Sequence, residues 1–259
     1  MSAHKGIRID RIFGIATLIS LLIFFMMIYF DFFANDSSEE TENKSSKATI
    51  EATQTEAKEK NGADEKEKCT SGVVVCLDAS HGGKDNGISY KSNVEKNITL
   101  DMVLAIKKEL ESVDVKVVLT RDADKDVSDS SRTKICNDSK AKLVVSFGMN
   151  TYSDNENVSG AEAFIHTSNP KESKSLSDSI LKRMSDDLGV KNRGVKTGKE
   201  TTVDDNFYIN AHSKCTSAVI NLGFMTNKTD INNVTTKKDA TAKAIAGGIT
   251  DYLKQAGLY

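Results

Sequence analysis

The sequence lacks an excess of charge of either sign. Among its 259 residues, 35 Lys and Arg face 37 Asp and Glu, so the formal net charge is −2 and the pI is near 6.1. It also lacks a stripe of Lys and Arg interleaved with aromatic residues. Because nucleic-acid-binding surfaces depend on concentrated positive charge, the sequence gives no reason to expect a nucleic-acid partner.

The sequence also lacks a C-x-x-C pair and any visible internal repeat. Its four cysteines, Cys69, Cys76, Cys136 and Cys215, are widely spaced, so a structural zinc cluster is not expected. If the domain is exported, three full disulfide pairings are arithmetically possible. The apolar patterns around Cys76 and Cys136 favour small buried thiols instead. Cys69 and Cys215 stay unassigned.

One long apolar run stands near the amino terminus. Residues 12–30 are almost uninterrupted, about nineteen residues, and a helix of that length crosses a bilayer core of roughly 30 Å. We therefore predict a transmembrane anchor over residues 12–33. A cleaved signal peptide is the alternative, but the run is longer than a usual signal core, and Asp31-Phe32-Phe33 lacks an A-x-A-like cleavage site.

The charges that flank this run predict its orientation. Lys5, Arg8 and Arg11 precede it and acidic residues follow it, so the positive-inside rule makes residues 1–11 a cytoplasmic stub. Residues 34–68 are polar with almost no apolar side chains, which predicts a disordered linker with a reach on the order of 30 Å. We expect the rest of the chain to lie outside a cell membrane, where such a tether suits a fixed partner such as a cell wall.

Residues 69–259 have the composition of one folded domain. The period-two and β-branched patterns predict strands over residues 73–77, 115–120, 143–147, 160–166, 207–210 and 218–222. The helical patterns predict helices over residues 95–113, 128–139, 171–188 and 240–253, with Asn93 as an N-cap and Gly189 as a C-cap. This order predicts a single α/β domain with a mainly parallel twisted sheet and helices on both faces.

A polar loop follows the first predicted strand. The apolar run over residues 73–77 breaks at Asp78-Ala79-Ser80-His81-Gly82-Gly83. A strand that ends in a turn carrying a histidine places that side chain at the mouth of a sheet. Glu95 begins the next predicted helix. His81 and Glu95 are therefore the first candidates for a metal site.

Six short motifs follow one another through the domain. They are DASHGGKDNG (78–87), EKNITL (95–100), LTRD (119–122), SGAE (159–162), RGVK (193–196) and LGFMTN (222–227). In this order they resemble the landmarks of the zinc-dependent N-acetylmuramoyl-L-alanine amidases of the type-3 family, including its membrane-anchored sporulation members. The resemblance covers residues 73–255, so residues 69–259 are expected to form an amidase-like domain.

The resemblance implies one zinc ion held by two His and one Glu, with a second Glu acting on the zinc-bound water. Such a site cleaves the amide between the lactyl group of muramic acid and L-alanine in peptidoglycan. Three protein ligands leave one position for water, whose pKa the metal lowers towards about 7. A carboxylate then moves the proton to the leaving amine.

Two of these parts are absent from the sequence. The family's second His follows its third strand in an S-x-H-x-N context, where this chain has Gly148 within Ser146-Phe147-Gly148-Met149-Asn150. The family's V-E-L-G-F is here Ile220-Asn221-Leu222-Gly223-Phe224, so Asn221 replaces the catalytic carboxylate. Ala79 and Ser80 also replace the Pro and Gly of the family's P-G-H step. Losing a general acid/base removes about 10² to 10⁴ in rate, so His81 and Glu95 are expected to hold zinc weakly or not at all.

The remaining polar residues carry alternative roles. His166 and His212 are candidates for a compensating ligand, or are ordinary polar residues. Asn150 and Asn221 would keep the shape and hydrogen bonding of a cleft that binds without cleaving, unless drift left them there. Arg193, in a predicted loop, either faces the cleft and binds substrate or is solvated. Two further arginines, Arg121 and Arg132, are expected to stabilise the fold.

The leading hypothesis is a membrane-anchored amidase homologue that has lost most or all hydrolysis and serves in peptidoglycan binding or regulation, with sporulation or wall assembly as the setting. A second hypothesis is an active amidase whose zinc site is completed by an unusual ligand. A third is a scaffold that docks a true amidase or another envelope protein.

Overall fold

The computed structural model of this chain describes residues 72–199 and 205–259. The predicted cytoplasmic stub (1–11), transmembrane anchor (12–33) and polar linker (34–68) lie outside the described residues. Within the part of the chain that is described, no helix combines the length and the apolar character needed to cross a bilayer.

A six-stranded sheet forms the centre of the domain, with the order β4-β1-β5-β8-β6-β7. Its neighbouring strands are parallel except for the antiparallel pair β6 and β8, which confirms the predicted mainly parallel sheet. The strands are β1 (Val74–Ala79), β4 (Lys116–Leu119), β5 (Leu143–Asn150), β6 (Ala161–Ile165), β7 (Asn192–Thr197) and β8 (Thr216–Phe224). A separate short hairpin pairs β2 (Ser89–Tyr90) with β3 (Asn93–Val94).

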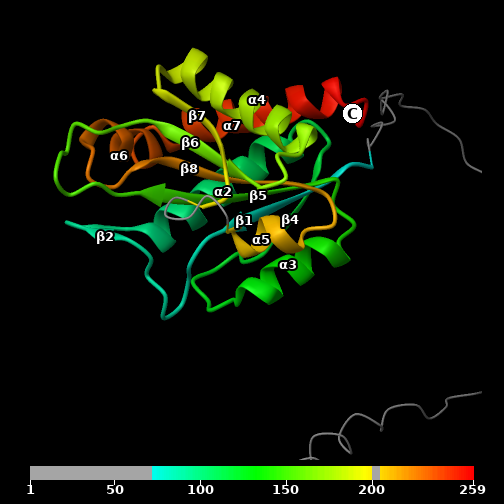
Figure 1. The fold of residues 1–259 in the computed structure, drawn as a ribbon, viewed down its shortest axis with the longest axis horizontal. Coiled ribbons are helices and arrows are strands. Elements are labelled where there is room, and N and C mark those ends of the chain that lie inside the picture. The colour runs from blue at the N-terminus through cyan, green and yellow to red at the C-terminus, as the bar shows by residue number, and fades with distance from the viewer. Residues whose placement is uncertain (1–71, 200–204) are drawn as a thin grey trace, which may run out of the picture. The chain divides into compact units, whose positions relative to one another are not determined.

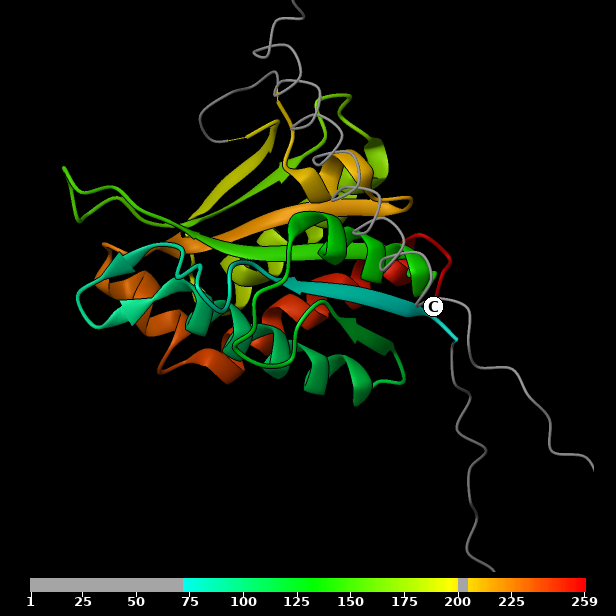
Figure 2. The ribbon, with the colours of Figure 1, turned by 90° about the horizontal axis from the view of Figure 1, so that it is seen from below.

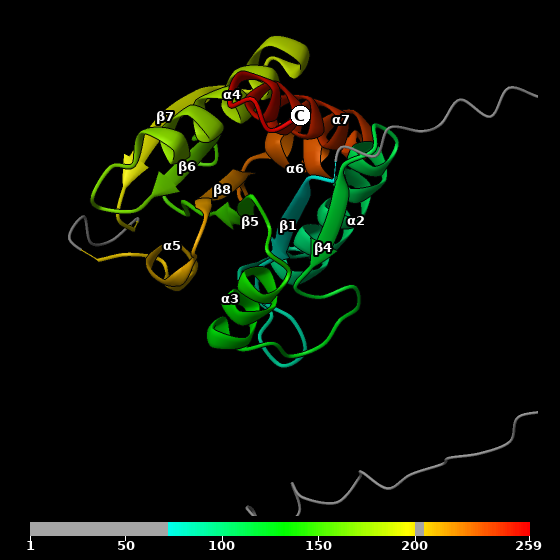
Figure 3. The same cartoon turned by 90° about the vertical axis from the view of Figure 1, so that its right-hand side faces the viewer.

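Helices cover both faces of the sheet, as the sequence predicts (Figures 1 and 3). One face carries α2 (Glu95–Glu111), α4 (Lys171–Leu188) and α7 (Lys238–Gln255), with the short α6 (Lys228–Val234) at the end of β8. The other face carries α3 (Asp129–Asp138) and the single-turn α5 (Tyr208–His212).

The larger apolar core lies between the sheet and α2, α4 and α7. Strand β5 is buried along its whole length, which explains its continuous apolar run. Helices α4 and α7 approach each other closely at Gly248, where a Cβ would lie 2.6 Å from the Ile180 Cα. A smaller cluster lies under α3 and α5, so this second face is covered over only part of its area.

Of the two predicted helix caps, Gly189 is confirmed and Asn93 is wrong. Gly189 ends α4 with φ at +67°, the left-handed conformation that favours glycine. Asn93 is not the N-cap of α2, because it pairs in the β2–β3 hairpin and Val94 occupies the cap without a side-chain hydrogen bond.

Two predictions on the second half of the chain are also wrong. Residues 207–210 were predicted as a strand, but Tyr208 to His212 form α5, and Ile209 packs into the smaller cluster with Phe164 and Val219. Arg193 was predicted in a loop, but it lies on β7, which pairs in parallel with β6 at the edge of the sheet. With one apolar residue among six, β7 lacks the pattern of a strand.

The prediction that Cys76 and Cys136 are buried thiols is also wrong, because a disulfide joins them. Cys76 lies on β1 and Cys136 on α3, and packing of α3 over this face of β1 brings the Cα atoms to 5.5 Å, within the usual range for a disulfide. Cys215 is a free thiol in the described part of the chain, and burial raises its pKa to about 11.

Candidate functional site

A cleft of about 690 Å³ opens on the face of the sheet that α3 and α5 only partly cover. Strands β1 and β5 both run towards the side of the domain where the β2–β3 hairpin lies (Figure 2), and their carboxyl ends supply the floor. Ligand sites of open α/β sheets form at these carboxyl ends. The main polar lining consists of Asp78, Ser80, His81, Asp85, Glu95, Asp126, Ser128, Asp129, Arg132, Ser146 and Asn221.

The structure brings His81 and Glu95 together in this cleft. His81 Nε2 lies 3.3 Å from Glu95 Oε2, and its Nδ1 lies 2.7 Å from Asp85 Oδ2. The Glu95 side chain is 4% exposed, whereas that of His81 is 30% exposed. The imidazole therefore lies between a buried carboxylate and an exposed one.

Backbone groups hold the Glu95 carboxylate in place. The amide of Ile88 donates to Oε2 at 2.8 Å and that of Met149 donates to Oε1 at 2.7 Å. Gly87, at φ +61°, passes so close that a Cβ would lie 2.5 Å from the His81 ring and 2.6 Å from Glu95 Oε2. Only glycine fits this backbone position.

These contacts favour the protonated form of the histidine. The hydrogen bond to Glu95 raises the pKa of His81 to about 9, burial opposes this shift, and Asp85 adds to it. At neutral pH a protonated ring in this arrangement bridges two carboxylates. Both ring nitrogens then carry protons, so a metal ion would have to displace one of them to find a lone pair.

Two buried arginines hold the loop that carries His81. Arg132 on α3 donates to Asp78 Oδ1 at 2.8 Å and to the carbonyls of Ala79 and His81. Arg121, 1% exposed, donates to the carbonyls of Ala79 and Ser80. These bonds confirm the prediction that both arginines stabilise the fold, and they leave His81 on a firmly held loop although its φ is +63°.

Gly148 and Asn221 lie side by side on neighbouring strands, as register partners of β5 and β8. A Cβ on Gly148 would lie 3.0 Å from Asn221 Oδ1 and 3.3 Å from Glu95 Oε1. Both distances are shorter than an ordinary contact of 3.4 to 4 Å. The asparagine amide therefore occupies the space next to the glycine, and the two residues fit each other.

A chain of hydrogen bonds orients the Asn221 amide. Asn150 donates its Nδ2 to Glu162 Oε1 at 2.7 Å, since a carboxylate accepts and does not donate. Its Oδ1 therefore faces residue 221 and accepts from Asn221 Nδ2 at 2.7 Å. Position 221 thus needs a donor, which an amide supplies and a carboxylate does not.

The side chains present do not fit a catalytic zinc ion. Such sites use three protein ligands, and the cleft offers His81 and Glu95 with bare backbone at Gly148. Across residues 72–199 and 205–259, no three His, Cys, Asp or Glu side chains group in a way that could hold a metal ion. The two histidines considered as compensating ligands stand elsewhere: His166 contacts Ser168 and His212 stacks on Tyr208.

The two predicted substrate-binding residues lie beside the cleft. Asn150 is 8% exposed and connects Asn221 to Glu162. Arg193 extends from β7 to Glu162, with its Nε 3.1 Å from the carboxylate. Both line a second hollow. The structure therefore places His81, Glu95, Gly148 and Asn221 together and sets this pair apart.

Three residues of the site were missed in the sequence. Asp85 and Gly87 stand in the same loop motif as His81, and their spacing of four and six residues from it was an available signal. Glu162 belongs to the SGAE motif, but its contact with Asn150 depends on the antiparallel pairing of β6 with β8, which nothing in the local sequence indicates.

The comparisons with known proteins point to one family. The profile described as N-acetylmuramoyl-L-alanine amidase (Amidase_3) matches residues 75–251. The chain is 28% identical over 186 residues to the N-acetylmuramoyl-L-alanine amidase LytC of Bacillus subtilis, covering 71% of this chain and 36% of LytC. The chain thus spans about a third of the length of that relative.

Solved structures agree. The N-acetylmuramoyl-L-alanine amidase AmiC2 of Nostoc punctiforme superposes with a TM-score of 0.63 at 28% identity, covering 70% of this chain and 97% of AmiC2. The CwlD amidase of Clostridioides difficile, solved in complex with the GerS lipoprotein, superposes with a TM-score of 0.64 at 28% identity, covering 71% of this chain and 99% of CwlD. Because the profile spans well over half of its sequence, this chain belongs to the N-acetylmuramoyl-L-alanine amidase family.

Proposed function

We propose that this chain is a membrane-anchored amidase homologue that binds peptidoglycan with little or no hydrolysis of it. The observation that carries the proposal is the fit between Gly148 and Asn221, at the two positions where the family resemblance implies a zinc ligand and a catalytic carboxylate. A Cβ on residue 148 would lie 3.0 Å from Asn221 Oδ1, so any side chain there, an imidazole included, requires the Asn221 amide to shift.

The cleft around them favours binding. It keeps a volume of about 690 Å³, which is in the usual range for a ligand site. The hydroxyl of Ser80 is buried on its floor and has no hydrogen-bond partner among the described residues. An unpartnered buried hydroxyl is unfavourable by about 1–3 kcal/mol, so a polar group of a ligand that reaches it would be stabilised.

The location follows from the amino-terminal sequence. With residues 12–33 as an anchor and residues 34–68 as a tether, the domain would work on the extracytoplasmic side of the cell membrane, within reach of the wall. The disulfide between Cys76 and Cys136 supports this location, because disulfides persist in oxidising compartments.

A partner protein is the second element of the proposal. CwlD, which shares this fold at 28% identity, was solved in complex with a lipoprotein. We propose that this chain likewise contacts another envelope protein, and that this contact is its regulatory role. If the domain neither binds nor cuts peptidoglycan but captures an envelope protein, the chain is a scaffold alone.

The test is to measure zinc content, peptidoglycan binding and hydrolysis on the same preparation. The expected result is less than one zinc per chain, cosedimentation with purified sacculi, and no release of new L-alanine amino termini. Zinc near one per chain together with such release would overturn the proposal in favour of an active amidase. LytC under identical conditions is the positive control.

A further inference from the structure

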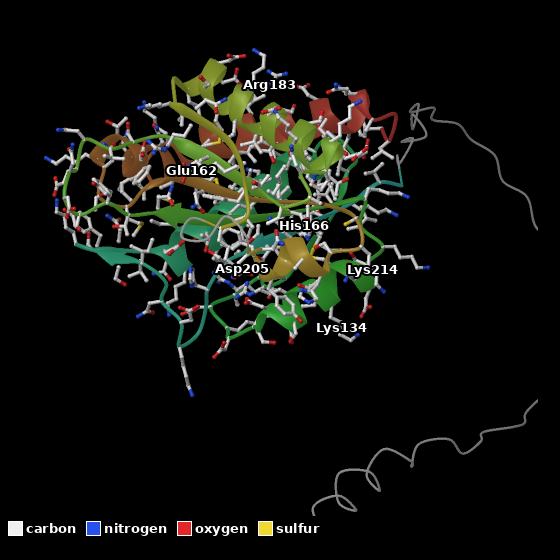
Figure 4. All side chains as sticks on the ribbon, viewed as in Figure 1. Lys134, Glu162, His166, Arg183, Asp205 and Lys214 are labelled. Carbon is white, nitrogen blue, oxygen red and sulfur yellow. A yellow bond between two sulfur atoms is a disulfide. The ribbon has the colours of Figure 1, made fainter. Side chains whose placement is uncertain are left out.

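A second hollow lies on the same face of the sheet, over β6 and β7, with a volume of about 430 Å³. Glu162 projects into it from β6 and lies among the strands in Figure 4. The lining consists of Asn150, Glu162, Phe164, Arg193, Lys196, Thr197, Lys199 and Phe224. We call this set of residues the basic pocket.

Positive charge outnumbers negative charge in the basic pocket. The buried carboxylate of Glu162 accepts from Asn150 on Oε1. Its Oε2 accepts from both Arg193 Nε at 3.1 Å and Lys196 Nζ at 2.6 Å. Two cations thus share one carboxylate, which leaves a net charge of +1. Lys199 does not change this balance, because Asp205 pairs with it at 2.7 Å.

The two cations are held in place and remain accessible. The Arg193 guanidinium lies 5.0 Å from the centre of the Phe224 ring, and Lys196 Nζ lies 5.5 Å from that of Phe164. These distances are within the range of cation–π contacts. Their side chains are 27% and 46% exposed, whereas Glu162 is 5% exposed. An incoming anion would therefore meet two oriented donors at the surface.

The basic pocket is coupled to the cleft. Asn150 hydrogen-bonds to Asn221 in the cleft and to Glu162 in the pocket. Strand β7 stands two positions from β8 in the sheet, and at about 4.8 Å per strand the separation is about 10 Å. An extended peptide covers that distance in about three residues.

We propose that the basic pocket binds a carboxylate of the peptide stem of peptidoglycan, contributed by the second residue after the lactyl amide. In this stem D-glutamate is joined through its side-chain carboxyl, so its α-carboxylate stays free for Arg193 and Lys196. The inference rests on the proposed function, since it assumes that the cleft holds the muramic acid end of the same ligand.

The test compares two soluble muramyl tripeptides on the full chain by calorimetry. Both carry L-alanine, a D-glutamate-derived residue and a carboxyl-terminal lysine amide, and they differ only in whether the D-glutamate α-carboxyl is free or amidated. We expect the free acid to bind about 10-fold more tightly, the ratio typical of one charge-assisted hydrogen bond.

Variants assign this difference to the pocket. Lys196→Gln is expected to remove most of the preference, and Lys196→Arg to retain it. Lys174→Gln is the matched control, because Lys174 is an exposed lysine on α4 that also pairs with a carboxylate, and it should leave the preference unchanged. Unfolding midpoints verify that each variant is folded.

The outcomes separate the two proposals. Equal affinity for the two tripeptides, or a preference that survives Lys196→Gln, would overturn the pocket assignment while peptidoglycan binding by the cleft still stands. If the unmodified chain binds neither tripeptide nor sacculi, the proposed function fails and the pocket assignment fails with it.

Discussion

The contact between Gly148 and Asn221 predicts that a zinc site can be restored only by changing both residues together. In Gly148→His alone, the new Cβ would lie 3.0 Å from Asn221 Oδ1. The amide would have to shift by a few tenths of an ångström, which strains its 2.7 Å bond to Asn150. Loss of one such buried hydrogen bond destabilises a fold by about 1–3 kcal/mol, so we expect this variant to be destabilised by up to that amount while it still lacks the catalytic carboxylate.

Asn221→Glu alone meets a different obstacle. Asn150 presents its carbonyl oxygen to position 221, because Glu162 holds its amide nitrogen. A carboxylate at 221 would face that oxygen and would lie near the buried Glu95. We expect the fold to be destabilised by about 1–3 kcal/mol. We expect no gain in zinc binding, because position 148 still supplies no histidine ligand.

The double variant Gly148→His with Asn221→Glu supplies both groups, and a bound zinc ion would offset the repulsion that the new carboxylate meets in Asn221→Glu alone. Zinc at 100 times its dissociation constant should then stabilise the folded state by about 2.7 kcal/mol, visible as a higher unfolding midpoint that a chelator reverses. Restoring a general acid/base should raise hydrolysis of purified peptidoglycan by about 10²-fold or more, measured as free L-alanine amino termini.

The double variant Gly148→Ala with Asn221→Gln is the control, because it adds a Cβ at position 148 and a side chain the size of Glu at position 221 without a new ligand or base. This control should show neither stabilisation by zinc nor increased hydrolysis of peptidoglycan. The reasoning would be refuted if the Gly148→His, Asn221→Glu protein folds but is not stabilised by zinc and does not hydrolyse peptidoglycan. The cleft would then differ from an active site in more than these two residues.

Three further predictions concern stability. Arg132→Ala should destabilise the domain by about 3–5 kcal/mol in urea unfolding, because it leaves the buried carboxylate of Asp78 without its cation. Arg183→Ala, at the surface of α4 (Figure 4), should change the free energy of unfolding by less than about 1 kcal/mol. Gly248→Ala should lower the melting temperature, because its Cβ would overlap backbone of α4, whereas Gly247→Ala, with 3.7 Å of clearance, should raise stability by about 0.5–1 kcal/mol. Burial raises the pKa of Glu162 but its hydrogen bonds lower it further, below the usual 4.5. Its stabilising contribution is therefore present above about pH 4.5 and is lost as pH falls, so the gap in stability between Glu162→Gln and the unmodified chain should close between pH 6 and pH 3.

The fold was predictable where apolar periodicity is strong. The stripe of α4 and the continuous run of β5 both correspond to buried faces. Where tertiary contacts decide, local pattern failed. Strand β7 is polar at the sheet edge and exists because β6 pairs with it. Four residues at 207–210 are too few to distinguish strand from helix, and Ile209 packs equally well from the single turn that forms.

The site was predictable to the extent that it is local in sequence. His81 lies in the loop that follows β1, and Glu95 is the first residue of α2. Each therefore belongs to a short sequence motif that can be recognised without the structure. The disulfide could not be found this way, because Cys76 and Cys136 are separated by 60 residues. Their pairing requires knowing which face of β1 helix α3 covers.

Two sets of polar contacts hold different parts of the cleft. Asp78 accepts from Arg132, Thr120 and Ser146 and holds the His81 loop from beneath. Neither residue 148 nor residue 221 takes part in these bonds. Asn221 is instead stabilised through Asn150. The bonds of Asp78 therefore hold the His81 loop directly, whereas a change at position 148 would reach His81 through Glu95, whose Oε1 would lie 3.3 Å from a Cβ there.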